Sequence, residues 1–99
     1  MERSASFPRI CPGFAEEDYA AFRAAIGEDH RLPSSYLEWR ARDCDEERIF
    51  LAAAHCATRR IPVRFSQFQR YCDSLRMRPS FALLIAYCVT LFAKVSQAA

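Results

Sequence analysis

Residues 59–72, RRIPVRFSQFQRYC, decide the fold. Apolar residues at positions 61, 63 and 65 alternate with Pro62 and Arg64, and such alternation predicts a short β-strand. The next four residues, SQFQ, form a capping box, in which a hydroxyl residue and a glutamine three positions later satisfy the free N–H groups that begin a helix. We therefore expect a strand over about 61–65 that leads directly into a short helix ending near Arg76.

A long helix is predicted upstream of this strand. Ser35 and Glu38 form another capping box, and the helix that they open reaches about Thr58, with a break near 43–45 left open. The apolar positions that recur near one face are Leu37, Ala41, Cys44, Leu51 and His55. Residues 49–57, IFLAAAHCA, are apolar on nearly every side, so we expect this end of the helix to be deeply buried.

Two further helices complete the prediction. The first covers about 15–26, where acidic residues occupy the first turn and Gly27 follows the end. The last covers 81–95, is capped by Ser80 and is the most hydrophobic part of the chain. Its uncharged run, 79–93, is shorter than the roughly 20 residues of a membrane span. We expect a buried core helix, no membrane association, and some helix surface left for a subunit or partner interface.

The sequence thus predicts a mainly α single domain over residues 1–99, with four helices and one short strand between the second and third. Residues 1–13, which contain Pro8, Pro12 and Gly13, are expected to form an irregular N-terminal arm. The strand has no evident mate except residues 6–11. Because an unpaired strand edge favours pairing with another chain, we expect a homodimer, supported by the apolar last helix.

The charge of the chain is unevenly distributed, although its net value is only +2. Residues 1–47 hold six arginines against eleven acids, a net −5, and residues 48–99 hold eight basic residues against Asp73, a net +7. One interpretation is that the two halves fold together and neutralise each other. The other is that a basic or an acidic surface is presented to a partner of opposite charge.

No pattern indicates catalysis, a metal site or a cofactor. The five cysteines are scattered, with no Cys-x-x-Cys pair, and are expected to be reduced and to pack as small apolar residues. His55 and Cys56 are adjacent on a predicted helix and point about 100° apart, so they cannot act as a pair. We expect no enzyme and no small-molecule substrate. The N-terminus has no apolar run, so no secretory signal is expected and the location should be cytoplasmic.

The candidate binding residues are basic or aromatic. Six arginines form a basic region that could grip an acidic protein surface or nucleic acid phosphate: Arg59, Arg60, Arg64, Arg70, Arg76 and Arg78. Tyr36 and Trp39 lie three positions apart on the first turn of the long helix. They are either a core anchor for that turn or an aromatic hot spot for a partner.

Residues 59–95 resemble the ribbon–helix–helix family of DNA-binding proteins. RIPVRFS is similar to the family's strand and helix start, and Ser80 to the cap of its second helix. The resemblance implies that two chains pair one strand each and that Arg60 and Arg64 enter the major groove. Two features depart from the family: the interval between Ser66 and Ser80 is about one helical turn short, and Pro62 takes a groove-facing position.

A second resemblance rests on LPSSYLEW (32–39), followed by a strand and by F-x-x-Y-C at 68–72. This spacing is similar to that of small uncharacterised proteobacterial proteins with an LPxxYxEW … FxxYC pattern and no assigned activity. In those relatives the strand tends to be acidic. The resemblance therefore implies that Arg64 is not a DNA reader and that the segment is a structural joint.

The function expected from these observations is that of a non-enzymatic macromolecular interaction protein. Short, motif-poor, charge-polarised bacterial chains resemble accessory or inhibitor proteins of phages and other mobile elements, anti-CRISPR proteins among them. Such a protein would bind a protein partner through a charged face and exposed aromatic residues. The alternative is a ribbon–helix–helix-like DNA-binding regulator that uses residues 59–95.

Overall fold

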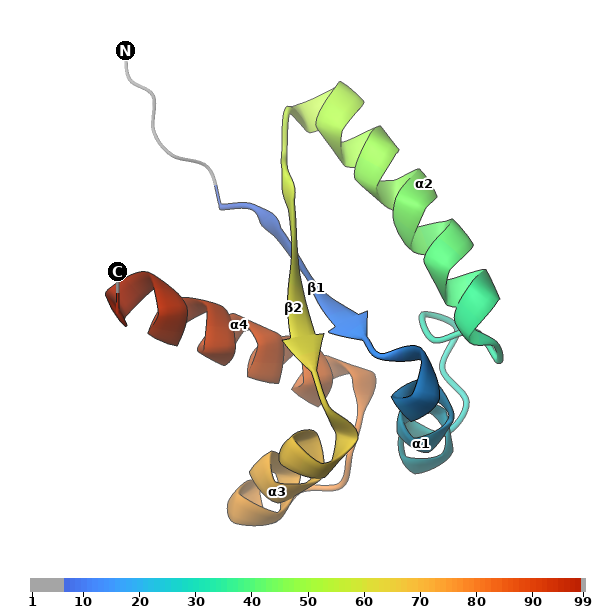
Figure 1. Cartoon of the computed structure of the whole chain (residues 1–99), viewed down its shortest axis with the longest axis vertical. Coiled ribbons are helices and arrows are strands. Elements are labelled where there is room, and N and C mark those ends of the chain that lie inside the picture. The colour runs from blue at the N-terminus through green and yellow to red at the C-terminus, as the bar shows by residue number, and fades with distance from the viewer. Residues whose placement is uncertain (1–6, 99) are drawn as a thin grey trace.

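The computed structural model describes the backbone of residues 7–98 and the side chains of residues 7–95. Its elements are, in chain order, β1 (Arg9–Phe14), α1 (Glu16–Ile26), α2 (Tyr36–Ala54), β2 (Thr58–Val63), α3 (Phe65–Leu75) and α4 (Phe81–Ala98) (Figure 1). The four helices and the strand between the second and third of them confirm the prediction. The fold contains two strands, however, where the sequence predicted one.

The unpredicted strand is β1, which lies mostly within the arm expected to be irregular. It pairs in parallel with β2, from Arg9 opposite Thr58 to Phe14 opposite Val63. The expected mate at 6–11 was thus placed a few residues early, and residues 1–6 lie outside the described part of the chain. The predicted strand over 61–65 lies instead at Thr58–Val63. RICPGF shows no apolar alternation, so it becomes a strand because β2 supplies its hydrogen-bond partners.

Both strands contain a proline, and the register of the sheet explains how each is accommodated. The N–H of Arg9 donates to the carbonyl of Ala57 at 2.7 Å. In a parallel ladder alternate residues of each strand bond to the partner. Pro12 and Pro62 therefore fall on positions that face the outer edges of the sheet, where the missing N–H removes no ladder bond. Each edge therefore lacks one N–H donor, at Pro12 on β1 and at Pro62 on β2.

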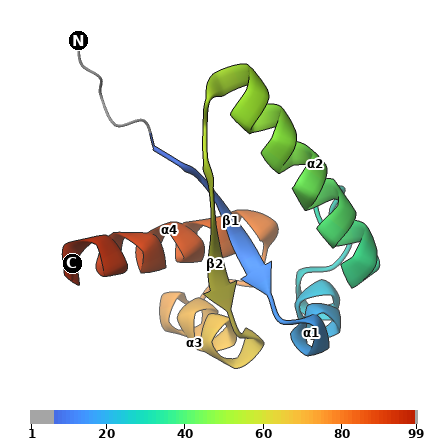
Figure 2. The same cartoon turned by 45° about the horizontal axis from the view of Figure 1, so that its top comes forward.

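The sheet lies between two helices. α4 packs across one face, and α2 lies over the other, while α1 and α3 follow the carboxyl ends of the strands (Figures 1 and 2). The core between these elements is rich in aromatic residues, with fully buried Phe22, Phe68 and Leu84 at its centre. Within the described residues, no helix is both long and apolar enough to cross a membrane.

Three of the four predicted helix ends are confirmed. The hydroxyls of Ser35 and Ser80 accept the N–H groups of Glu38 and Leu83, each at 3.1 Å. Gly27 ends α1 with φ 84°, a left-handed backbone that glycine adopts without steric cost. The capping box at Ser66 is wrong, because α3 already begins at Phe65.

The end of α2 also differs from the prediction. The helix is continuous through 43–45 and ends at Ala54. Instead of being deeply buried, Ile49, Phe50 and Leu51 are 57%, 43% and 56% exposed. This end projects away from the other helices (Figures 1 and 2), and no described element covers it. The apolar composition of residues 49–57 therefore did not predict their burial, because burial requires that another element pack against the helix.

Candidate functional site

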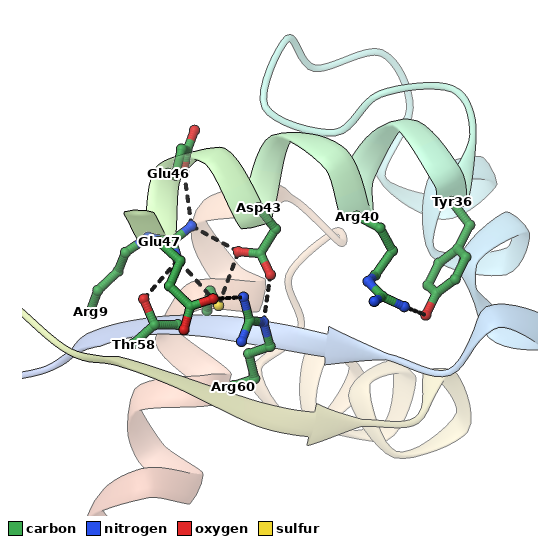
Figure 3. A network of polar contacts seen from close by, with 9 residues as sticks. Arg9, Tyr36, Arg40, Asp43, Glu46, Glu47, Thr58 and Arg60 are labelled. Carbon is green, nitrogen blue, oxygen red and sulfur yellow. Dashed lines mark hydrogen bonds and ion pairs between the residues drawn. The ribbon is translucent and has the colours of Figure 1, made fainter. Parts of the chain in front are cut away.

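A buried carboxylate joins α2 to both strands. Asp43, whose side chain is 3% exposed, accepts hydrogen bonds from Arg9 Nη2 at 2.9 Å and from Arg60 Nε at 2.6 Å (Figure 3). Arg9 and Arg60 reach the same carboxylate because the register pairs residues 9 and 11 with 58 and 60, which places these side chains on the face beneath α2. Asp43 therefore fixes the angle at which α2 crosses the sheet.

Each arginine of this network holds a second carboxylate nearer the surface. Arg9 Nη2 bonds Glu46 at 2.9 Å, and Arg60 Nη2 bonds Glu47 at 2.7 Å. Arg9 Nη1 also donates to the hydroxyl of Thr58 at 3.1 Å. Two guanidinium groups are thus shared among three carboxylates, and the charge of Arg60 is neutralised inside the protein.

The ion pairs of the network keep Asp43 and Arg60 charged. Burial by itself disfavours the charged form of Asp43, but hydrogen bonds from Arg60 and Arg9 outweigh burial and lower its pKa. Hydrogen bonds to Glu47 and Asp43 raise the pKa of Arg60. Burial, followed by the nearby Asp43 carboxylate, raises the pKa of the Cys11 thiol to about 12. The Cys11 thiol is therefore protonated at neutral pH.

A second ion pair joins the two halves of the chain at the start of α3. Arg64 Nε donates to Asp18 Oδ2 at 2.8 Å, and the same oxygen accepts the N–H of Phe65 at 2.9 Å. The hydrogen bond from Arg64 and then that from Phe65 lower the pKa of Asp18. A carboxylate from α1 therefore caps α3, the role that the sequence assigned to Ser66.

The six predicted arginines consequently fall into three groups. Arg60 and Arg64 are held by acids of the first half, so the two halves do neutralise each other in part. Arg59 turns to the opposite face of the sheet and lies over the ring of Phe92, 5.3 Å from its centre. Arg70, Arg76 and Arg78 are exposed, and no ion pair with another of the described residues engages them.

Two of these arginines, Arg76 and Arg78, follow the end of α3, and Arg70 lies further back on that helix. We name Arg70, Leu75, Arg76, Met77 and Arg78 the corner surface. Arg76 adopts a left-handed backbone, with φ 56°. Its N–H donates to the carbonyl of Asp73 at 3.0 Å, and that of Met77 to Cys72 at 3.1 Å, the pattern of a Schellman helix end. Leu75 and Met77 are 46% and 55% exposed beside the arginines. The predicted end of this helix near Arg76 is confirmed, but the left-handed turn was not predicted, because it lacks the usual glycine.

Tyr36 and Trp39, the two aromatic residues at the start of α2, pack against the core. Trp39 is only 7% exposed and packs edge-on against Phe14, with ring centres 5.0 Å apart. Tyr36 is half-buried against Tyr19, and its hydroxyl accepts a weak hydrogen bond from Arg40 at 3.4 Å. Of the two interpretations left open by the sequence, the position of Trp39 favours packing over partner recognition.

The two histidines lie at opposite ends of α2, and His30 Nδ1 is 3.9 Å from Asp29 Oδ1. His30 and His55 are both exposed, one in the loop before α2 and the other at its C-terminal end. In the part of the chain that the structure describes, no three potential ligands form a cluster that could hold a metal ion. Cys11, Cys72 and Cys88 are buried in the core, and Cys44 is exposed.

Comparisons of the chain with protein-family models, curated proteins and solved structures find no match. The resemblances to small proteobacterial proteins and to the ribbon–helix–helix family therefore stay predictions. β2 already has a mate within its own chain, which removes the unpaired strand as a reason for a homodimer. The arginines that would read a DNA groove, Arg60 and Arg64, are bound to carboxylates.

Proposed function

We propose that this protein is a non-enzymatic binding protein that grips an acidic surface of a protein partner through the corner surface. The observation that carries the proposal is that exposed Arg76 and Arg78, each without an ion pair among the described residues, alternate with exposed Leu75 and Met77 at the end of α3, with exposed Arg70 earlier on the same helix. Arginine and methionine are enriched at protein interfaces, where aliphatic area is buried beside charge-assisted hydrogen bonds.

The mixed character of the corner surface favours a protein partner over nucleic acid. Phosphate contacts need cations, and exposed aliphatic side chains add nothing to them. A partner with carboxylates around an apolar patch would engage the arginines, Leu75 and Met77 together.

The position of Arg76 adds support. A left-handed conformation costs a residue with a Cβ atom about 1 kcal/mol more than it costs glycine. His55 shares this conformation, so the backbone alone does not single out Arg76; what distinguishes Arg76 is its position between exposed Leu75 and Met77. At this turn the side chain projects from an exposed corner, where it is available to a partner.

An accessory or inhibitor role, of the kind found in phages and other mobile elements, agrees with this proposal. Such a protein acts by occupying a surface of its target, so it needs rigid display of charge and apolar area but no reactive group. The ion pairs at Asp43 and Asp18 provide that rigidity, because the first fixes α2 to the sheet and the second fixes the start of α3 to α1.

The test compares two glycine substitutions at matched helix ends. Arg76→Gly and His55→Gly each relieve a left-handed residue at an exposed helix terminus, φ 56° and 51°. Both should raise thermal stability slightly, by up to about 1 kcal/mol. A peptide library displayed on phage would be selected on the wild-type protein, and the affinity of enriched peptides measured for each variant.

Enriched peptides should be acidic with apolar residues, and Arg76→Gly should weaken their binding at least about fivefold, the loss of one charge-assisted contact. His55→Gly should leave their binding unchanged. Equal binding by wild type and Arg76→Gly would refute the proposal. Tighter binding of duplex DNA than of any peptide, with steep weakening by salt, would favour the DNA-binding alternative instead.

A further inference from the structure

A cavity of about 430 Å³ lies along the outer edge of β1. Four consecutive β1 residues, Arg9–Pro12, line it, whereas none of the described lining residues belongs to β2. The cavity is therefore on the side of β1 that faces away from its partner strand. Trp39 of α2 and Phe81 and Ile85 of α4 supply an apolar wall.

The backbone of β1 presents unused hydrogen-bonding groups to this cavity. Because Arg9 bonds toward β2, the alternation of a parallel ladder turns the N–H and C=O of Ile10 and the C=O of Pro12 to the outer edge. No hydrogen bond within the described residues engages the N–H of Ile10. A short open edge beside an apolar pocket is the arrangement by which a sheet accepts an added strand. Pro12 offers no donor, so the added strand would centre on Ile10.

The mouth of the cavity is rich in hydrogen-bond donors. Arg31 gives Nε and Nη2 to Asp29, at 2.9 and 2.8 Å, and its guanidinium lies 4.7 Å from the ring centre of Phe81. Arg42 Nη1 donates to the carbonyl of His30 at 2.8 Å, with Glu38 at 3.7 Å from Nη2. Since a guanidinium has five N–H donors, both arginines keep donors free for a ligand.

The acidic residues in the cavity wall do not occupy these free N–H donors of Arg31 and Arg42. Asp43 and Glu46 both line it, but both are bonded to Arg9, and Asp43 also to Arg60. Both oxygens of Asp43 and Oε1 of Glu46 thus accept from guanidinium groups of the network. A carboxylate at the mouth would meet Arg31 and Arg42.

We propose that an extended, acidic segment of a protein partner adds to the open edge of β1 as a third strand. Its backbone bonds the N–H and C=O of partly buried Ile10, an apolar side chain packs on Trp39 and Phe81, and a carboxylate engages Arg31 and Arg42. This site is separate from the corner surface and rests on the proposed function only in that both take a protein partner.

The probe is a short blocked peptide of alternating valine and glutamate with a central phenylalanine, and its counterpart has lysine in place of glutamate. Each is titrated into the ¹⁵N-labelled full chain and followed by NMR. The acidic peptide should shift the Ile10 amide resonance and slow its hydrogen exchange. Arg42→Glu should weaken the binding about tenfold, since it replaces an attraction with a repulsion.

Arg48→Glu is the matched control, because Arg48 lies on the same helix, is paired with Asp45 and does not line the cavity. It should leave the affinity unchanged, whereas Ile85→Trp, which fills the cavity, should abolish binding. Equal binding of the lysine peptide, or an unaltered affinity in Arg42→Glu, would overturn the proposal whether or not Ile85→Trp folds. Weakening by Arg76→Gly would assign the peptide to the corner surface, and so would also overturn it.

Discussion

Replacing Asp43 with asparagine should destabilise the fold more than any other single change of charge in α2. The substitution keeps the shape of the side chain but leaves Arg9, 12% exposed, and Arg60, 38% exposed, without their common carboxylate. Breaking a buried ion pair costs about 3–5 kcal/mol. Here each arginine keeps a second carboxylate, and Arg60 is partly solvated, so we expect the lower end, about 3 kcal/mol.

In a domain of this length, such a loss lowers the thermal midpoint by about 12–24 °C, measurable by circular dichroism. Asp45→Asn is the control, because its pair with Arg48 is about two-thirds exposed on both sides, and it should cost less than about 0.5 kcal/mol. A loss below about 1 kcal/mol for Asp43→Asn would refute the structural role of the network.

The same carboxylate sets a dependence on pH. Because the pKa of Asp43 is lowered in the folded protein, its contribution to stability is complete above the unfolded value, about 3.9. The contribution is lost as the pH falls below that value and through the folded pKa. The wild-type midpoint should therefore drop on acidification below pH 4 more steeply than that of Asp43→Asn. Parallel curves would show that other groups govern acid unfolding.

Three further predictions concern single side chains. Asp18→Asn should lower the midpoint of urea unfolding, because it weakens the cap of α3 and the bond to Arg64, whereas Glu16→Gln should not; equal midpoints would contradict this cap. A thiol reagent at neutral pH should label Cys44 first and spare Cys11 and Cys88, whose pKa values burial raises to about 12; peptide mass spectrometry would reveal early labelling of either buried thiol, which would contradict their placement. Trp39 fluorescence should be blue-shifted and weakly quenched by acrylamide, and strong quenching would restore the interpretation of Trp39 as a surface hot spot.

Local signals in the sequence predicted the helices well. A hydroxyl followed by a helix-forming run is sufficient to place Ser35 and Ser80, and glycine at the end of α1 is similarly informative. The capping box predicted at Ser66 was wrong because the residue that caps α3 is Asp18. Asp18 lies 47 positions upstream of Phe65 and meets it only in the folded protein. β1 was missed for the same reason, since RICPGF acquires its hydrogen bonds from a strand far along the chain.

At the candidate site, too, local sequence features were predictive and contacts between distant residues were not. The opposite charges of the two halves predicted that some pairing would occur, but not that Arg60 would be taken by Asp43 and Arg76 left without an ion pair among the described residues. The turn at Arg76 had no glycine to indicate it. The exposure of Ile49 to Leu51 could not be read from composition, because burial depends on whether another element covers the helix.

The separation of the arginines into an internal and an available group is tested most directly by NMR of their Nε–H groups. In the free protein, the Nε–H signals of Arg60 and Arg64, which donate to Asp43 and Asp18, should exchange slowly with water. Those of Arg70, Arg76 and Arg78 should exchange rapidly and become protected when a selected acidic peptide binds. Rapid exchange at Arg60 and Arg64, or corner arginines that stay unprotected in the complex, would contradict the account.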